Sequence, residues 1–586
     1  MTKEVKDTST RPSRPKPKIQ WREWSQAPFD DAKTSKRLVL LDLSAEWCHW
    51  CHVMDETTYS NAEIIDTINR RFIPIRVDID KRPDISERYN RGGFPTTAFL
   101  SEQGESIWGA TYVPPEDMKN VLRAMLEAQK KGEVDEVLAR ERMQYLDLSR
   151  ALEKNESVDR EFVDAIFEDI FAAYDVEWGG FGIEPKFPHA DAIDLLIERY
   201  AHTNDSELAG AVVSTLDHMT KGLHDDVEGG VFRYSVKRDW RVPHYEKMLD
   251  TNLGFLRNLA RARQILGHER YGRTAESVGK YLLGTLRDPK TGGFFSSQDA
   301  DEEYYKLDKT MRGARPHPKI IDEIFSGLNC RAVSILVEAG ALLGRQEWVD
   351  AGKMAWQMVI REFWSPTTGL IKHMSGDSLF LFDDQVEFFE ALIAIAETQS
   401  REDMESTLHL GEDLIKGVGN AFAHPDGGYG DVMRERGAIG KLAYPERSIA
   451  ANSRWATTLA LFGAATYKPE RSHEAWATLK SFTPKRVQAN GIFASDYVYA
   501  WDVLELGPKA VEIHGIAGEP TGNDLWNTAK KALDPGTVVL ASRRVMLEIP
   551  APRPFAVICK ETGCSKEIYE PGELARQLRP LPPGQI

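Results

Sequence analysis

Two cysteines three residues apart, Cys48 and Cys51, form the pattern with the clearest chemistry in this chain. They follow an apolar run, residues 38–43, which indicates a buried strand. A Cys-x-x-Cys at a turn from strand to helix places the first sulfur at a helix N-terminus. There the exposed N–H groups and the helix dipole stabilise a thiolate. An accessible thiolate with a second thiol one turn behind it can carry out disulfide exchange.

Two other interpretations fit the same residues. Cys48-His49-Trp50-Cys51-His52 matches the C-x-x-C-H pattern of covalent haem attachment, and Cys48, Cys51 and His52 could supply three zinc ligands. Haem attachment of this kind normally belongs to exported proteins, whereas residues 1–18 are polar and contain no apolar export core. Zinc requires a further ligand, and no second Cys/His pair stands at finger spacing. Residues 72–80 indicate a second strand, and residues 91–100 indicate a turn, a proline and a third strand, which favours redox chemistry.

Residues 38–112 resemble thioredoxin. The segment from Asp42 to Cys51 is similar to the active-site strand and turn of that family, including Trp47. Phe94-Pro95-Thr96 is similar to the loop whose cis proline faces the cysteines.

The thioredoxin resemblance implies a role for each of these residues. Cys48 is the attacking thiol and Cys51 the resolving one, while Asp42 is the buried acid that accepts a proton from Cys51. Pro95 blocks metal capture and presents backbone to an extended substrate. Asp42 could also be an ordinary strand-end carboxylate. Because His49 and Trp50 replace the usual Gly-Pro, the reduction potential is not carried over.

Composition places narrow bounds on the class of protein. The chain has 586 residues, 42% hydrophobic and 28% charged, with ample material for a large core. A net charge of −16 argues against nucleic-acid binding, and no apolar run approaches the roughly 20 residues that span a bilayer. Five cysteines do not make a disulfide framework, so we expect a reducing, cytoplasmic compartment.

A glycine-containing motif recurs six times, spaced by roughly 50 to 77 residues, and alternates with helical segments. A unit of this length has room for two helices, and six helical hairpins in a ring make an (α/α)6 barrel with these loops at one end. The alternative is a chance scatter of glycines that cap helices. The six motifs are residues 178–181, 228–232, 291–294, 367–370, 426–429 and 490–493.

Polar and aromatic residues follow the first three of these loops, at the predicted mouth of the barrel. Aromatic rings stack on sugar faces, and carboxylates or histidines transfer protons, so the mixture suits a carbohydrate ligand. His244 and Glu246 could serve as base and orienter, and Asp299 and Asp301 as an acid/base pair. The alternative is that these groups only satisfy helix ends and loop backbone. The candidate substrate-binding residues are Lys186, Arg233, Tyr234, His244, Glu246, Asp299 and Asp301.

The whole chain, from residue 21 to residue 578, resembles the spermatogenesis-associated protein 20 family. That family joins a thioredoxin-like domain to a six-hairpin glycosidase-like barrel similar to glucosamine epimerases, and it implies no settled reaction. The chain departs from the family pattern before Trp21, after the third loop, where an insertion is missing, and at residues 325–329. The matching segments are residues 48–54, 92–95, 109–114, 185–188, 233–235, 244–249 and 298–301.

The resemblance and the periodicity together predict a multidomain chain. Short strands at residues 511–515 and 536–540, around a helix at 525–533, form a small α/β C-terminal segment. Cys559 and Cys564 near its end are either a redox relay for Cys48 and Cys51 or a structural pair. The predicted parts are a disordered tail (1–20), a thioredoxin-like domain (21–113), a helical connector (114–157), the barrel (158–506) and the C-terminal segment (507–586).

The resulting hypothesis is a thiol–disulfide oxidoreductase whose barrel binds or presents the substrate. We expect no cofactor, no bound metal, and no nucleic-acid or membrane partner. Protein disulfides or a thioredoxin-type reductase are the expected partners, with a carbohydrate as a possible barrel ligand. One alternative is a carbohydrate epimerase or glycosidase-like enzyme regulated by the thioredoxin module. Another is a non-catalytic scaffold with a Cys/His metal site.

Overall fold

The computed structural model describes residues 18–140, 158–433, 438–516, 519–521, 523–542 and 553–578. The chain divides into an N-terminal unit, Met1–Leu146 with Ile439–Leu442, and a barrel unit, Asp147–Ala438 with Ala443–Ile586. Most of the predicted disordered tail and residues 141–157 of the predicted connector lie outside the described residues.

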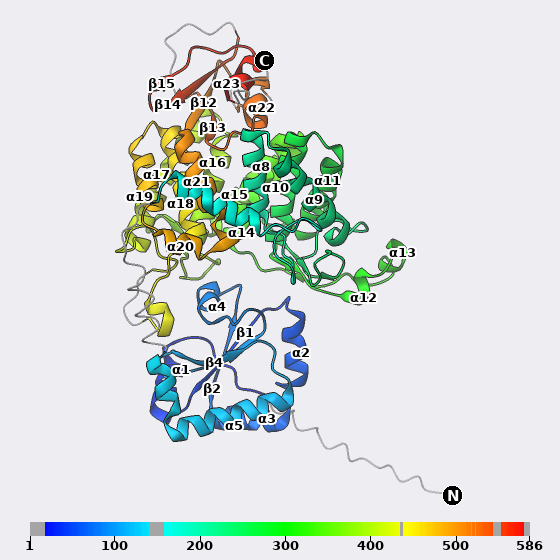
Figure 1. Cartoon of the computed structure of the whole chain (residues 1–586), viewed down its shortest axis with the longest axis vertical. Coiled ribbons are helices and arrows are strands. Elements are labelled where there is room, and N and C mark those ends of the chain that lie inside the picture. The colour runs from blue at the N-terminus through cyan, green and yellow to red at the C-terminus, as the bar shows by residue number, and fades with distance from the viewer. Residues whose placement is uncertain are drawn as a thin grey trace, which may run out of the picture. The chain divides into compact units, whose positions relative to one another are not determined.

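The N-terminal unit is built on a four-stranded sheet in the order β2-β1-β3-β4 (Figure 1). The central strand β1 (Val39–Ser44) runs parallel to β2 (Ile73–Asp78) and antiparallel to β3 (Thr96–Leu100). Its first five residues are all buried, as expected for an apolar run covered on both faces. The strands predicted at residues 38–43, 72–80 and 91–100 are confirmed, and β4 (Ser106–Ala110) adds an edge strand that was not predicted.

Five α-helices that accompany this sheet lie entirely within the described residues. Helix α5 buries Met118 and Leu122 in the same core as Ile64 and Ile68 of α3, so the first part of the predicted connector packs within the thioredoxin-like unit. The helices are α1 (Gln26–Ser35), α2 (His49–Thr57), α3 (Ala62–Arg71), α4 (Pro83–Tyr89) and α5 (Pro115–Lys131).

A short segment from much later in the chain also belongs to the N-terminal unit. The Lys441 N–H donates to the Tyr89 hydroxyl at 3.1 Å, and Arg88 donates to the Lys441 carbonyl at 3.1 Å. Nothing in the local sequence signals this placement, because the segment Ile439–Leu442 lies between barrel elements in the sequence.

Six helices of the barrel unit form a closed inner ring, in which each contacts the next and α21 returns to α8. An outer helix packs on each of them: α9 on α8, α11 on α10, α15 on α14, α17 on α16, α19 on α18 and α7 on α21. The described residues therefore form the predicted (α/α)6 barrel, whose sixth hairpin is closed by helices from its two sequence ends. The inner helices are α8 (Ala190–Thr203), α10 (Leu249–Leu266), α14 (Ser326–Leu343), α16 (Phe382–Ala396), α18 (Ile449–Thr466) and α21 (Ser495–Leu506), and the outer ones are α7 (Arg160–Ala172), α9 (Ser206–Leu223), α11 (Glu269–Tyr281), α15 (Gln346–Glu362), α17 (Arg401–Phe422) and α19 (Glu470–Leu479).

The two ends of the barrel differ in loop length. Connections from an inner to an outer helix are short, such as residues 204–205, 267–268 and 344–345. Connections from an outer to an inner helix are long, such as 173–189, 224–248 and 287–325, and they carry the glycine motifs. The long loops therefore gather at the N-terminal ends of the inner helices, as predicted. Their short elements are β5 (Tyr234–Ser235), β6 (Pro243–His244), β7 (Lys247–Met248), β8 (Ser297–Gln298), β9 (Ile320–Ile321), β10 (Trp364–Ser365), β11 (Leu370–Ile371), the small helices α12 (Glu302–Tyr305), α13 (Lys309–Arg312) and α20 (Pro484–Gln488), and the non-α turns η1 (Leu282–Leu286), η2 (Gly440–Ala443) and η3 (Gly491–Ala494).

Four of the long loops are held by the same side-chain device, which we call the amide clamp. The fourth residue of an inner helix is Asn or Gln, and its amide accepts from the N–H and donates to the C=O of one loop residue, at 2.7–3.1 Å. Each clamp satisfies two backbone groups of a loop that turns inward, which would otherwise remain unpaired. The pairs are Asn252 with Val231, Asn329 with Phe294, Gln385 with Ile371 and Asn452 with Tyr429.

Glycine is required where these loops approach the helices. Gly230 has φ +75°, and a Cβ there would lie 2.5 Å from the ring of Tyr281. Any other residue would therefore have to displace a buried ring.

The C-terminal segment packs on the barrel end that carries the short loops (Figure 1). Glu397, which follows α16, accepts from the Val539 N–H at 2.9 Å and from Lys530 at 2.6 Å, and its carbonyl accepts from the indole of Trp526. The predicted strands and helix of this segment are confirmed. Its sheet has the order β13-β12-β14-β15, with β12 (Lys509–His514), β13 (Thr537–Ala541), β14 (Phe555–Lys560) and β15 (Gly563–Cys564), accompanied by α22 (Asp524–Lys531) and α23 (Pro571–Leu578).

One described helix, α14, is long and apolar enough to cross a membrane by its length and composition. It is an inner barrel helix and 72% of it is buried inside the structure, which accounts for its composition.

The amide clamp predicts a large stability cost for a single polar substitution. Asn329→Ala leaves the buried N–H and C=O of Phe294 without partners, so we expect the free energy of unfolding of the barrel to fall by about 2–5 kcal/mol. Urea unfolding followed by far-UV circular dichroism measures this. The matched control is Asn420→Ala on the exposed face of α17, expected to change stability by no more than about 0.5 kcal/mol. Equal effects of the two substitutions would contradict the clamp.

Candidate functional site

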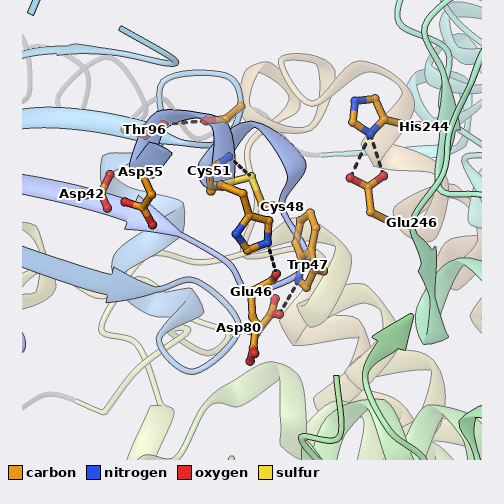
Figure 2. The surroundings of a disulfide bond; sticks show 12 residues. Asp42, Glu46, Trp47, Cys48, Cys51, Asp55, Asp80, Thr96, His244 and Glu246 are labelled. Carbon is orange, nitrogen blue, oxygen red and sulfur yellow. Dashed lines mark hydrogen bonds and ion pairs between the residues drawn. A yellow bond between two sulfur atoms is a disulfide. The ribbon is translucent and has the colours of Figure 1, made fainter. Parts of the chain in front are cut away.

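The two cysteines of the N-terminal unit lie where the sequence placed them. Cys48 is the N-cap of α2, and its sulfur accepts a hydrogen bond from the Cys51 N–H at 3.2 Å. The two sulfurs are joined in a disulfide with a Cα–Cα separation of 5.2 Å (Figure 2). The sequence predicts an accessible thiol at Cys48, but in the disulfide-bonded protein this sulfur is buried. Cys48 is 4% exposed because its sulfur is engaged by the first turn of the helix and by Cys51.

Pro95 is brought to the same end of the sheet. The Phe94–Pro95 peptide bond is cis, which confirms the prediction from the thioredoxin-like loop. Leu43, near the end of β1, pairs with Thr96, at the start of β3. Pro95 therefore lies just before β3, at the same end of the sheet as the C-terminus of β1, which leads to Cys48.

Asp42 is a buried acid, but it is not isolated. It accepts from Arg76 at 2.6 Å and from the Tyr59 hydroxyl at 3.2 Å, and Arg76 also binds Asp55. Burial raises the pKa of Asp42 to about 6, and the Arg76 guanidinium opposes that rise. The carboxyl group therefore titrates close to neutral pH, as a group that exchanges a proton with Cys51 would need to.

Two neighbours of the cysteines have structural partners. The Trp47 indole donates to Asp80 at 2.6 Å, which fixes the turn that precedes Cys48 (Figure 2). The exposed ring of His52 bonds to the carbonyl oxygen of Glu46 at 2.7 Å. Trp50 is 45% exposed, so the replacement of the usual Gly-Pro places an aromatic surface next to the disulfide.

The geometry does not form the three-ligand zinc arrangement. The sulfurs of Cys48 and Cys51 are bonded to each other, and the His52 ring bonds to backbone. Within the described ranges, no group of three or more His, Cys, Asp or Glu side chains is arranged to hold a metal ion.

Lys186, predicted to bind substrate at the barrel mouth, is instead an internal structural cation. Its side chain is 0% exposed, and its ammonium donates to Asp175 at 2.6 Å. Lys247 repeats this pattern one hairpin later, donating to Asp225 at 2.7 Å and to the Gly229 carbonyl at 2.8 Å. Both lysines therefore hold glycine loops in place, because a buried ammonium is tolerated only when it is paired.

The predicted pair of His244 and Glu246 is formed. The His244 Nδ1 lies 2.7 Å from a carboxylate oxygen of Glu246, which is 1% exposed (Figure 2). The His244 ring stacks on Tyr234 at 4.8 Å, and Tyr234 stacks on Phe187 at 4.5 Å. Arg233 also lies beside this group, with its guanidinium carbon 5.7 Å from the centre of the Tyr234 ring.

Asp299 and Asp301 are held by local backbone. Asp301 is the N-cap of α12 and accepts from the Tyr304 N–H at 2.9 Å. Asp299 accepts from the Ala300 N–H at 2.8 Å, and its own N–H donates to the Lys319 carbonyl. Both carboxylates thus shape the third loop, which is the structural alternative set out for them above.

The predicted C-terminal cysteine pair is also a disulfide. Cys559 of β14 and Cys564 of β15 face each other across an antiparallel pair, with a Cα–Cα separation of 4.0 Å. Cys559 is buried, whereas Cys564 is exposed. Cys330, on the apolar helix α14, is a buried free thiol.

The most charged part of the barrel was not predicted. The lumen contains a network in which Arg257 binds Asp191 and Asp194, and Arg454 binds Glu390. A sequence signal existed, because charged residues recur at helical spacing on otherwise apolar inner helices. Examples are Asp191, Asp194 and Glu198 on α8, Arg257 and Arg261 on α10, and Glu387 and Glu390 on α16.

Comparison with known proteins matches the N-terminal part of the chain to a family and about half of the chain to named relatives. Residues 12–154 match the family Thioredox_DsbH, described as "Protein of unknown function, DUF255". Mouse spermatogenesis-associated protein 20 is 31% identical over 323 residues, which cover 50% of this chain and 40% of the mouse protein. The resemblance to the spermatogenesis-associated protein 20 family is confirmed. The chain spans about two fifths of the length of the curated relatives it matches.

Two further similarities concern the separate units. Thioredoxin H2 of Arabidopsis thaliana is 27% identical over 101 residues, which cover 17% of this chain and 73% of that protein. A solved structure of a sugar epimerase from a ruminal bacterium overlaps 57% of this chain and 98% of its own, at 11% identity and a TM-score of 0.44. The barrel assignment rests on the helix contacts described above.

The buried Asp42 predicts a stability that depends on pH. The folded protein holds the proton of Asp42 more tightly than the unfolded chain does, because folding raises the pKa of this acid from 3.8 to about 6. The free energy of unfolding therefore falls as the pH rises from about 3.8 to about 6. Asp42→Asn imitates the neutral carboxyl. We therefore expect β1 amides to be better protected in the variant at pH 7.5, by up to about 3 kcal/mol, and nearly equal at pH 4.

Hydrogen exchange followed by mass spectrometry, with both proteins compared at each pH, measures that difference. Asp66→Asn, on the exposed surface of α3, is the control and should show no pH-dependent gain. A variant less protected than the wild type at pH 7.5 would contradict the assigned titration.

Proposed function

We propose that the N-terminal unit catalyses thiol–disulfide exchange through Cys48 and Cys51. The observation that carries this proposal is the position of Cys48. Its sulfur caps α2, accepts the Cys51 N–H and is already bonded to the Cys51 sulfur. In the reduced protein the same N–H and the helix N-terminus stabilise a thiolate on Cys48. The similarity to the DUF255 family and to thioredoxin H2 supports the same chemistry.

The proposed cycle transfers two electrons. The Cys48 thiolate attacks one sulfur of a substrate disulfide, forms a mixed disulfide and releases the other substrate sulfur as a thiolate. Cys51 then loses its proton and attacks the Cys48 sulfur. This step closes the Cys48–Cys51 disulfide and releases the substrate's second thiolate, so the substrate is reduced and the cysteine pair is oxidised.

Asp42 is the proposed proton acceptor for the second step, acting through the polar groups around it. Its pKa of about 6 leaves it mostly ionised at neutral pH yet able to hold a proton. Arg76 bridges Asp42 and Asp55, so it fixes the orientation of the acid.

The cycle requires a source of reducing equivalents, and a thioredoxin-type reductase or a small thiol is the class of partner that fits. Protein disulfides are the proposed substrates, in a reducing compartment such as the cytoplasm. The barrel is proposed to bind the substrate through its exposed aromatic residues, among which Phe187 and Phe493 are 36% and 65% exposed.

A trapping experiment tests the redox proposal. Cys51→Ser leaves Cys48 free to attack but removes the thiol that resolves the product, so a mixed disulfide on Cys48 should accumulate when the reduced variant meets an oxidised protein such as insulin. Mass spectrometry identifies what is bound. Cys48→Ser is expected to lose all measurable insulin reduction.

The matched control is Cys330→Ala, which removes the buried cysteine outside both pairs and should leave insulin reduction unchanged. Capture of Cys559 or Cys564 by Cys48 would identify the chain's own disulfide as the acceptor. Full insulin reduction by Cys48→Ser would refute the proposed mechanism.

A further inference from the structure

The lumen of the barrel holds a cavity of about 230 Å³, room for roughly seven waters. All six inner helices line it, and residues 529–539 of the C-terminal segment close it at one end. Nothing in the proposed redox cycle uses this cavity. Twelve of its 25 lining residues are charged. Burying that many charged side chains is costly unless the charges serve a purpose or are fully paired.

The lining has an excess of negative charge. Eight Asp or Glu side chains line the cavity, against four Lys or Arg side chains. Two further cations, Arg331 and Lys509, lie behind the lining and pair with Asp191 and Asp534, and they still leave the acids in the majority.

The cations are already shared among several acids. Arg261, for example, lies 2.8 Å from Glu338, 3.6 Å from Glu198 and 3.7 Å from Asp194. A guanidinium that serves three carboxylates cannot neutralise each of them, so the network lacks positive charge.

Asp496 is the lining carboxyl group that lacks a direct partner among the described residues. Among the carboxyl groups that line the described cavity, it has no hydrogen bond or ion pair with another residue. Its charged surroundings are Asp191 of α8, Arg257 of α10, Glu390 of α16 and Arg454 of α18. Both arginines are engaged elsewhere, Arg257 with Asp191 and Asp194 and Arg454 with Glu390.

The pKa shifts of Asp496 and Asp191 agree with an excess of negative charge in the lumen. Burial and the neighbouring Asp191 carboxylate raise the pKa of Asp496 to about 8, while Arg454 and Arg257 oppose that rise. For Asp191, burial acts in the same direction, but Arg331 and Arg257 hold its pKa well below its ordinary value. With this pKa, Asp496 keeps a proton at neutral pH, which reduces the excess of negative charge in the lumen.

A second acceptor lies at the closed end of the cavity. Asp534 is 8% exposed, and one of its oxygens binds Lys509 at 2.6 Å. Its other oxygen, Oδ1, is shielded from solvent and has no hydrogen-bond donor. Acceptor groups therefore line the cavity both at the N-terminal end of α21, where Asp496 lies, and at its closed end.

We propose that the barrel lumen is a binding site for a small aliphatic amine in its ammonium form. The ammonium group would donate to Asp496, Asp191 and Glu390, supplying the positive charge that the network lacks. A neutral ligand could not supply that charge, and an anion would be repelled. The cavity, about 230 Å³ in volume, has room for a short diamine.

Binding should release a proton. An ammonium beside Asp496 favours its ionised form, so Asp496 gives up its proton when the amine enters. Isothermal titration calorimetry of the full-length protein at pH 7, in two buffers of different ionisation enthalpy, measures this. The probe is putrescine, and its neutral isostere 1,4-butanediol is the control ligand. We expect millimolar or tighter binding of putrescine with release of close to one proton, and no binding of the diol.

Asp496→Asn keeps the shape of the neutral acid but cannot ionise. We expect it to fold normally by circular dichroism, to bind putrescine at least tenfold more weakly and to release no proton. The matched control is Asp502→Asn, which lies on the same helix but pairs with Arg160 and Arg199 outside the lumen, and it should bind as the wild type does.

Three results would overturn the proposal: no binding of putrescine, equal binding of the diol, or unchanged affinity and proton release in Asp496→Asn. The proposal is independent of the redox function. Cys48→Ser should bind putrescine as the wild type does, and loss of insulin reduction in that variant does not bear on the cavity.

Discussion

The barrel depends on satisfying the backbone of its long inward-turning loops. In four hairpins the fourth residue of the inner helix is an amide that pairs with both backbone groups of one loop residue, as Asn329 does with Phe294. The same amide donates to the carbonyl at the start of its helix, so one side chain ties the loop to the helix N-terminus. The mouth of the barrel is the consequence of repeating this connection around a ring.

Buried charged groups in both units also need partners, and they differ in how fully they find them. Asp42 has an arginine partner, and its pKa rises only to about 6. Asp496 faces two carboxylates and two arginines that are already engaged, and its pKa rises to about 8. Lys186 and Lys247, each paired with one aspartate, show the fully compensated case, in which a buried ion pair serves only to hold a loop. The supply of partners thus separates structural charges from candidate functional ones.

The residues that the sequence predicts to be functional also fall into these two groups, structural and candidate functional. Cys48 bonds to Cys51, and His244 pairs with Glu246, because the members of each pair are close in the sequence. Pro95 reaches the end of the sheet that leads to Cys48 through the pairing of β1 with β3. The acids Asp299 and Asp301 were equally prominent in the sequence, yet their oxygens are used by neighbouring N–H groups. A polar residue in a loop is as often needed by the backbone as by a substrate.

The sequence by itself determined the local features of this protein: the strand that ends in Cys48, the cis proline loop, the six glycine motifs and the alternation of helices. These follow from short-range periodicity and turn chemistry, which operate within a few residues. Only the tertiary structure decided which charges share a lumen, and that Ile439–Leu442 packs with a domain that ends some three hundred residues earlier. Closing the ring brings together residues as distant as Asp191 and Asp496, and the energy of a buried charge depends on neighbours that no local pattern specifies.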